Sequence, residues 1–320
     1  MPELVTESIV VDALRQVEDP ELHRDVISLN MVRDLKIAGD SVSMTLVLTT
    51  HACPLSGPFK AAVEEALLGI PGVATANVAL DAEVRAHKGA AERKPVEGVK
   101  NIIAIASNKG GVGKSTVATN LAVALAKRGA AVGLLDADIT GPNIPTMMGF
   151  ESGFQTKQEG GLKTDTRHGV RVCSIGFALP KGTPVVWRGP MIGTAVRDFL
   201  HNVDWGELDY LIVDLPPGTS DASMSMVQEA PIAGAVIVST PQNIALEDAT
   251  KAVAMFDRLQ VPVFGVVENM SYFIAPDTGT VTRFSVTAAL KWRRRSWASS
   301  SWARCPLTRR LAWPATPVRP

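Results

Sequence analysis

The chain is poor in cysteine, with Cys53, Cys173 and Cys305 as its only three among 320 residues. They lie far apart in the sequence and offer no disulfide framework. Apolar runs of membrane-spanning length are also missing, and residues 1–8 lack the charged and apolar regions of a signal peptide. These absences predict a cytoplasmic protein with no membrane partner.

Acidic side chains are missing from the C-terminal part of the chain. No Asp or Glu follows Asp277, whereas nine Lys or Arg lie in residues 283–320. Residues 1–282 hold 23 basic and 32 acidic side chains, a balance of −9. An acidic body repels the nucleic-acid backbone, so no nucleic-acid partner is expected. The length of 320 residues suggests two domains.

The strongest motif is the stretch 107–116, SNKGGVGKST. It follows an apolar run typical of a buried strand, residues 101–106, and precedes residues 117–127, whose apolar positions have helical spacing. A strand, a glycine-rich loop and a helix in this order form a phosphate cradle from backbone N–H groups and the helix dipole. Asn108 replaces the first glycine of the usual G-x-x-x-x-G-K-[ST] pattern. Asparagine tolerates a positive φ, so the loop is expected to close.

This loop predicts a nucleotide site with a metal ion. Lys114 is expected at the β- and γ-phosphates, and the Ser115 hydroxyl in the coordination sphere of Mg²⁺. The predicted nucleotide-binding residues of the loop are Lys109, Gly110, Gly111, Val112, Gly113, Lys114, Ser115 and Thr116.

Two further apolar runs end in aspartate. Residues 131–135 lead into Asp136 and Asp138, and residues 210–213 lead into Asp214. Carboxylates at the carboxyl ends of strands beside the loop strand face the nucleotide crevice of a doubly wound sheet. Asp214 is therefore predicted near the metal, as in a Walker B element. Alternating strand and helix patterns predict an α/β fold with a doubly wound, mainly parallel sheet.

A smaller domain precedes this sheet. Residues 1–88 are predicted to form a small α+β domain with two helices and three strands. Residues 89–99 are the expected linker, and residues 100–280 the nucleotide domain. Cys53 lies where a strand meets a helix, a place that favours metal or thiolate chemistry. A partly buried cysteine that serves as a small apolar residue is an equally good interpretation.

Four motifs, together with the small domain, resemble those of the Mrp/ApbC iron–sulfur cluster carrier ATPases: KGGVGKST, DADITGPN, DLPPGT and VVENMSYF. That family is part of the deviant P-loop group that includes MinD and ParA. The resemblance implies a homodimer that binds ATP and Mg²⁺, hydrolyses ATP slowly and works with iron–sulfur scaffold or recipient proteins. A regulatory ATPase of the ParA/MinD kind, which carries no cluster, is the alternative.

The resemblance also implies roles for single residues. Lys109 would reach the phosphates of a nucleotide held by the partner subunit, and Asp138 would position or activate the attacking water. Asp136 would support Mg²⁺ through its water shell, and Asn269 would contact adenine. The catalytic residues are then Lys109, Lys114 and Asp138, and the metal residues are Ser115, Asp136 and Asp214.

The chain departs from the family at the expected cluster site. Many members carry a C-x-x-C pair after the N-M-S-x-F segment, but the corresponding positions here hold Ala275 and Thr278. Neither side chain can ligate iron. Cys53 is left as the candidate cluster or thiol site, and one thiol per chain needs a dimer or other ligands to hold a cluster.

The tail, residues 281–320, is rich in Arg, Trp and Ser and holds four of the six tryptophans. A basic, aromatic nucleic-acid or membrane arm is one interpretation. A shift of one base in GC-rich codons instead permits a glycine turn, an acidic amphipathic helix, a strand and a proline turn, similar to the usual ending of the family. We therefore expect a frameshift product that lacks the last helix and strand. Such a tail would be disordered or prone to aggregate, and an inactive protein is a third possibility.

Reading the gene tests this hypothesis directly. We expect a one-base insertion or deletion near the codons for residues 279–284, because the family resemblance ends there. Resequencing that region is the measurement, and an intact single frame across it removes the hypothesis.

Overall fold

The structure is a computed structural model, and it describes residues 5–20, 22–51, 53, 55–84, 86, 93–138, 141–150, 162–177, 189–218, 221–275, 277–283 and 301–307. Contacts divide the chain into two compact units, Met1–Arg85 and Ala86–Pro320. Within the described ranges, no helix is both long enough and apolar enough to cross a membrane. Part of the expected linker (residues 89–92) and most of the tail (284–300 and 308–320) lie outside the described residues.

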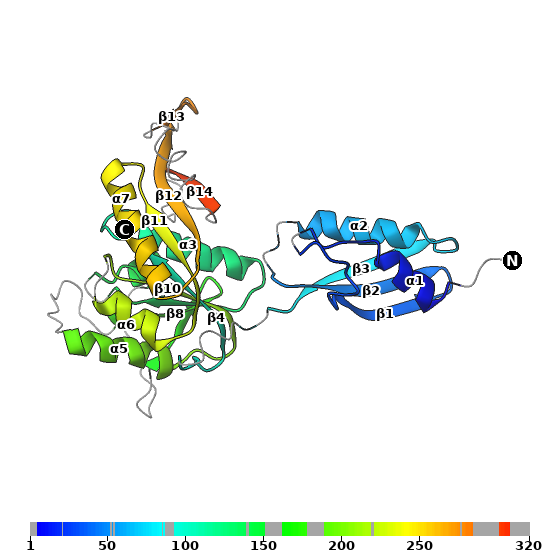
Figure 1. Ribbon diagram of the computed structural model, residues 1–320, viewed down its shortest axis with the longest axis horizontal. Coiled ribbons are helices and arrows are strands. Elements are labelled where there is room, and N and C mark those ends of the chain that lie inside the picture. The colour runs from blue at the N-terminus through cyan, green and yellow to red at the C-terminus, as the bar shows by residue number, and fades with distance from the viewer. Residues whose placement is uncertain are drawn as a thin grey trace, which may run out of the picture. The chain divides into compact units, whose positions relative to one another are not determined.

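The first unit packs two helices against a three-stranded sheet, as predicted (Figure 1). Strands β1 and β2 are antiparallel, and β3 pairs with β2 in parallel. Alternate residues of β2, from Val42 to Leu48, are buried in the core that the two helices complete. The elements are α1 (Glu7–Leu14), β1 (Val32–Ala38), β2 (Ser41–Leu48), α2 (Ser56–Leu68) and β3 (Thr75–Ala82).

The second unit is built on a large sheet. Its elements are β4 (Val99–Ala106), α3 (Lys114–Lys127), β5 (Val132–Asp136), α4 (Ile144–Met147), β6 (Leu162–Lys163), β7 (Asp165–Arg167), β8 (Val170–Ser174), the 3-10 helix η1 (Ile175–Phe177), α5 (Gly189–His201), β9 (Val203–Asp204), β10 (Leu208–Asp214), α6 (Asp221–Glu229), β11 (Ile232–Ser239), α7 (Asn243–Arg258), β12 (Val263–Ile274), β13 (Val281–Arg283) and β14 (Ser301–Leu307).

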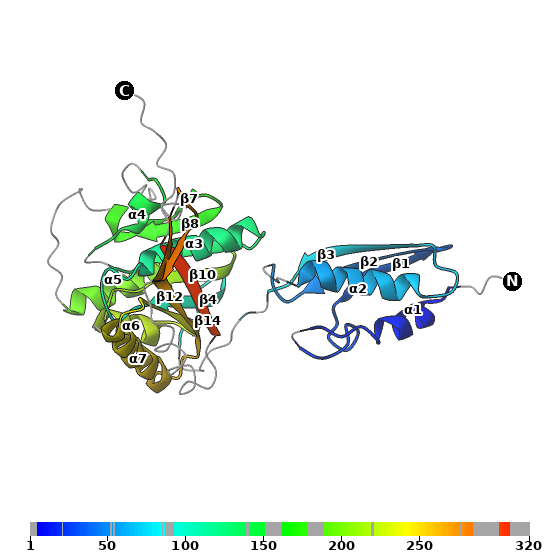
Figure 2. The ribbon, with the colours of Figure 1, turned by 90° about the horizontal axis from the view of Figure 1, so that it is seen from above.

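Among the described residues, nine strands form this sheet in the order β13-β12-β11-β4-β10-β5-β8-β7, with β14 also paired to β12. The strands from β12 to β8 run parallel, and β7 and β13 are antiparallel additions. Helices α3 and α4 lie on one side of the sheet, and α6 and α7 on the other (Figure 2). The predicted doubly wound, mainly parallel sheet is confirmed.

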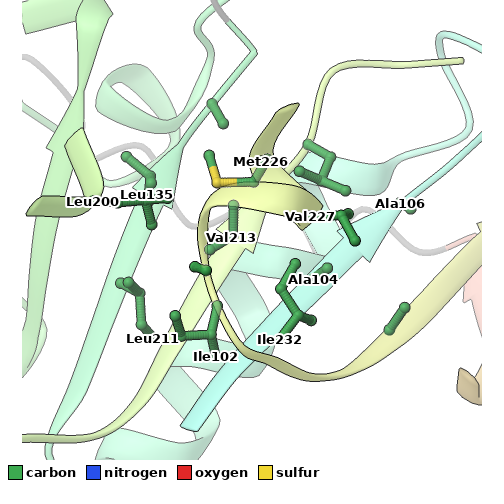
Figure 3. Close-up of a cluster of buried hydrophobic side chains, with 14 of the residues drawn as sticks. Ile102, Ala104, Ala106, Leu135, Leu200, Leu211, Val213, Met226, Val227 and Ile232 are labelled. Carbon is green, nitrogen blue, oxygen red and sulfur yellow. The ribbon is translucent and has the colours of Figure 1, made fainter. Parts of the chain in front are cut away.

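The core explains why the central strands read as continuous apolar runs. Ile212 of β10 packs into the cluster on the α3 side, whereas Leu211 and Val213 pack into the cluster under α5, α6 and α7 (Figure 3). A strand buried on both faces has no solvated face and therefore needs no polar alternation. Because these strands are parallel, their carboxyl ends meet at one edge of the sheet.

One expectation about local structure is wrong. The tail is predicted to be disordered or prone to aggregate, but residues 301–307 form β14, a parallel neighbour of β12. The open edge of β12 offers backbone hydrogen bonds that local sequence does not reveal. Strand β12 itself continues through residues 268–271 to Ile274.

Candidate nucleotide site

The phosphate-loop candidate joins β4 to α3. Gly111 and Gly113 adopt left-handed φ values of 79° and 87°, where a larger side chain would be strained. Gly113 is also the N-cap of α3, and a Cβ there would collide with the Nδ2 atom of Asn269. The loop therefore needs glycine at this position both for its turn and for its neighbour. Its backbone and the first turn of α3 lie where a cradle for an anion is predicted.

Asn108 has a different role from the predicted one. It is not among the residues with positive φ, so its tolerance of that conformation is not what lets the loop close. Its side-chain Nδ2 donates a hydrogen bond to Asp248 Oδ1 of α7 at 3.4 Å. Asn108 therefore ties the loop to α7.

The predicted acidic residues come together around Lys114. Asp136 and Asp214 lie at the same register on neighbouring strands and are fully buried. The Lys114 ammonium lies 2.7 Å from Asp214 Oδ1 and 3.9 Å from Asp138 Oδ2. It also lies 3.5 Å from the Ser115 hydroxyl. The structure thus places five of the predicted site residues side by side.

Negative charge exceeds positive charge in this cluster, and burial makes the excess costly. Burial first and the charge of Asp214 second raise the pKa of Asp136 to about 7. Burial also raises the pKa of Asp214, although Lys114 acts in the opposite direction. Burial removes both carboxylates from water, and the ion pair with the single Lys114 cation offsets only part of that cost in free energy.

A metal ion fits this arrangement. Asp214 Oδ2 is buried and has no hydrogen-bond partner within the part of the chain that the structure describes. Buried polar atoms are almost always paired, so such an oxygen marks a place for a ligand. No group of three or more His, Cys, Asp or Glu side chains among the described residues could hold a metal alone. The remaining ligands of Mg²⁺ would come from Ser115, water and nucleotide phosphates.

Asn269 contacts the loop. Its Nδ2 donates to the Val112 carbonyl at 2.9 Å, and its Oδ1 accepts from the Met270 amide at 2.9 Å. Met270 has a left-handed φ of 57°, which bends β12 at this point. Asn269 is 7% exposed. The side chain predicted to contact adenine therefore also fastens β12 to the phosphate loop.

The segment that follows β10, residues 215–218, is held to the phosphate loop by its backbone. The Gly218 amide donates to the Ser107 carbonyl at 2.8 Å, and Gly218 has a φ of 88°. Ser223 of α6 places its hydroxyl 3.4 Å from the carbonyls of Pro216 and Gly218. Ile139 and Thr140, in the segment after β5, and Thr219, in the segment after β10, lie outside the described residues.

Lys109 lies beside α7. Its carbonyl accepts a hydrogen bond from the Ser107 hydroxyl at 3.0 Å. Lys251 above all, with smaller effects from Asn108 and Lys109, holds the pKa of Asp248 below its usual range. Lys109 therefore lies within electrostatic reach of α7.

The candidate cluster residues are divided between the two units: Cys53 is in the first, and Ala275 and Thr278 are in the second. Cys53 is a free, half-buried thiol that packs against the core of the first unit, just before α2. Ala275 and Thr278 lie in the turn after β12, where the Ala275 amide donates to the Thr280 carbonyl at 3.0 Å. The described residues of this turn include no cysteine.

The comparison with known proteins agrees with this architecture. A family model described as "NUBPL iron-transfer P-loop NTPase" matches residues 98–313, and one described as "Iron-sulfur cluster assembly protein" matches residues 7–78. The chain belongs to this family of iron-transfer P-loop NTPases. The match at residues 98–313 includes the segment that forms β14.

Similar proteins include an iron–sulfur cluster carrier protein of Synechocystis, 52% identical over 278 residues, or 86% of this chain and 79% of the relative. A carrier protein of Deinococcus radiodurans is 50% identical over 83% of this chain and 75% of its own length. A nucleotide-binding protein of Archaeoglobus fulgidus, solved in complex with ADP, is 40% identical, with a TM-score of 0.59 over 68% of this chain and 85% of its own.

Sequence reasoning missed Ser174, which ends β8 beside Asp136. A signal existed, because Ser174 follows an apolar strand in the same way as Asp136 and Asp214 do. Serine is too common at strand ends for this signal to stand out. It also missed Glu268, which is buried and bonded to Ser271.

The raised pKa of Asp136 predicts how stability depends on pH. An unfolded aspartate loses its proton near pH 4, whereas Asp136 in the folded protein holds it until about pH 7. Its contribution to the free energy of unfolding is therefore full below about pH 4 and is lost as the pH rises through about 7. We expect Asp136→Asn to stabilise the nucleotide-free protein at pH 8 and to lose this advantage toward pH 4. Urea unfolding across this range measures it.

The exposed Asp12→Asn serves as the control, because Asp12 lies on the surface of α1. Its effect should not depend on pH in this way. Equal pH profiles for the parent and Asp136→Asn would contradict the prediction.

Proposed function

We propose that this protein is an ATP-dependent iron–sulfur cluster carrier that binds and slowly hydrolyses ATP with Mg²⁺ as a homodimer. It would pass clusters between scaffold and recipient proteins. The observation that carries the proposal is the Lys114–Asp214 pair at the end of a phosphate loop, in a chain of the iron-transfer family. The relatives named as cluster carriers support this function over that of a ParA/MinD-like regulator.

Nucleotide binding would rearrange the ion pair. The Lys114 ammonium, which now neutralises Asp214, would move to the β- and γ-phosphates. Asp214 and the Ser115 hydroxyl would then hold Mg²⁺, which supplies charge neutralisation at the phosphates. Asp136 would bind the ion through water. This exchange would offset the buried negative charge, because Lys114 would pair with phosphate and Mg²⁺ would pair with the Asp214 carboxylate.

Asp138 is the proposed residue that orients the attacking water. Its Oδ1 accepts a hydrogen bond from the Gly141 amide at 3.2 Å, and its Oδ2 lies 3.9 Å from Lys114. A carboxylate held on both sides in this way can direct a water at the γ-phosphate. Lys109 would act on the nucleotide of the partner subunit, and Asn269 would contact adenine.

The cluster is the cargo, and the thiols of the chain limit where it can bind. Cys173 is buried beside Asp136, and burial with that charge raises the pKa of its thiol to about 12. It is therefore a poor source of the thiolate that iron requires. Ala275 and Thr278 supply no thiol. Cys53 is the proposed ligand, paired with Cys53 of a second chain or with other ligands.

Magnesium-dependent nucleotide binding is the first test. We expect Mg²⁺ to tighten the binding of a fluorescent ADP analogue by at least about tenfold in the parent, since the ion links Asp214 to the phosphates. Asp214→Asn should bind the analogue without Mg²⁺ but lose this enhancement. Titration with and without Mg²⁺ measures both.

Asp257→Asn on the exposed side of α7 is the matched control and should behave as the parent. A parent protein that binds no nucleotide would rule out the proposed function.

Anaerobic reconstitution with iron and sulfide tests the cargo. We expect the parent and Cys173→Ala to retain iron and visible absorption, and Cys53→Ala to lose both, because Cys53 is the proposed ligand. The same measurement on Cys305→Ala tests whether the cysteine of β14 contributes a ligand to iron. No bound iron in any of these proteins, with nucleotide binding intact, would leave an ATPase without cargo and favour the regulatory alternative.

A further inference from the structure

Three polar residues form a row across the end of the sheet. Asp214, Asp136 and Ser174 lie at the same register on β10, β5 and β8. All three are fully buried. Lys114 approaches one end of the row at Asp214, and Ser174 occupies the other end.

Ser174 is bonded on both sides. Its hydroxyl donates to Asp136 Oδ2 at 2.9 Å and accepts from the Gly176 amide at 3.0 Å. A serine hydroxyl has one proton to donate. Because the Gly176 amide is itself a donor, it bonds to the hydroxyl oxygen, and the hydroxyl proton is directed at the Asp136 carboxylate. A hydrogen bond to a buried carboxylate is among the stronger ones in proteins. Ser174 is thus a dedicated donor to Asp136.

The two oxygens of Asp136 are therefore unequal. Oδ2 accepts from the Ser174 hydroxyl and from the Ile144 amide at 3.2 Å. Oδ1 accepts only a longer bond from the Asp138 amide, at 3.3 Å, among the hydrogen bonds of the described residues. Oδ1 is the oxygen with capacity to accept a further hydrogen bond.

Gly176, whose amide donates to Ser174, is closely packed. A Cβ on Gly176 would lie 3.0 Å from Pro142 Cβ and 3.2 Å from the Cγ of Pro145 in α4. Little space therefore separates Gly176 from the segment between β5 and the end of α4. Packing of this kind holds a donor in one geometry.

We propose that Ser174 is a positioning residue for the magnesium ion. It holds Asp136 by Oδ2 and so presents Oδ1 to a water molecule in the coordination shell of the ion. The inference rests on the proposed magnesium-nucleotide function and adds a residue to it. Outer-shell hydrogen bonds of this kind commonly change metal affinity by about 10–100-fold.

The test is a Mg²⁺ titration of fluorescent ADP-analogue binding in the parent, Ser174→Ala and Ser174→Thr. We expect Ser174→Ala to need about tenfold more Mg²⁺ for half of the effect. Its affinity for the analogue without Mg²⁺ should equal that of the parent. Ser174→Thr, which keeps the hydroxyl, should restore the Mg²⁺ requirement of the parent.

Ser239→Ala is the matched control. Ser239 is also a buried serine at the end of a strand, but its hydroxyl donates only to the carbonyls of Thr240 and Ala245 among the described residues. We expect no change in its Mg²⁺ requirement, whatever it does to the melting temperature.

The inference is overturned if Ser174→Ala titrates as the parent does, if Ser239→Ala shifts the Mg²⁺ requirement equally, or if Ser174→Thr fails to restore it. A parent protein that binds the analogue without responding to Mg²⁺ overturns the proposed magnesium site itself. The two failures are therefore distinguishable.

Discussion

The buried ion pair between Lys114 and Asp214 is the interaction on which the rest of the site depends. A lysine that is 6% exposed needs carboxylates beside it, because an unpaired buried ammonium is very costly. Asp136 and Asp138 add negative charge that one lysine cannot balance. The sheet imposes this arrangement, since parallel strands of equal register bring their last residues together. The cluster therefore carries an excess of buried negative charge, which a further cation would offset.

The same geometry explains which parts of the molecule could be predicted from the sequence. The loop, the strands before it and the aspartates after β5 and β10 are local signals: apolar runs buried on both faces, then glycine or aspartate. Each needs only neighbours in sequence to be recognised. The small N-terminal domain was readable for the same reason, because the alternate residues of β2 and the helical spacing of α2 define one buried face each.

The contacts that the sequence could not reveal join segments that are far apart in the chain. Asn269 reaches Val112 across 157 positions, and Asn108 reaches Asp248 across 140. Such contacts depend on strand order and on the bend at Met270, which no local pattern specifies. Ser174 belongs to the same class, since its role follows from the pairing of β8 with β5. The order of 301–307 is a further example, because a strand can form wherever an open edge accepts it.

Strand β12 links the two halves of the proposed function. Asn269, in the middle of the strand, is fastened to the phosphate loop. The strand ends at Ile274, and a turn that includes Gly279 leads on to β13. The family resemblance implies a C-x-x-C pair in the turn after this strand, but here Ala275 and Thr278 stand at those positions and supply no thiol. Strand β12 therefore joins the candidate nucleotide site to a turn whose described residues include no cysteine. A cluster held by Cys53 would belong to the first unit, whereas the candidate nucleotide site and β12 belong to the second.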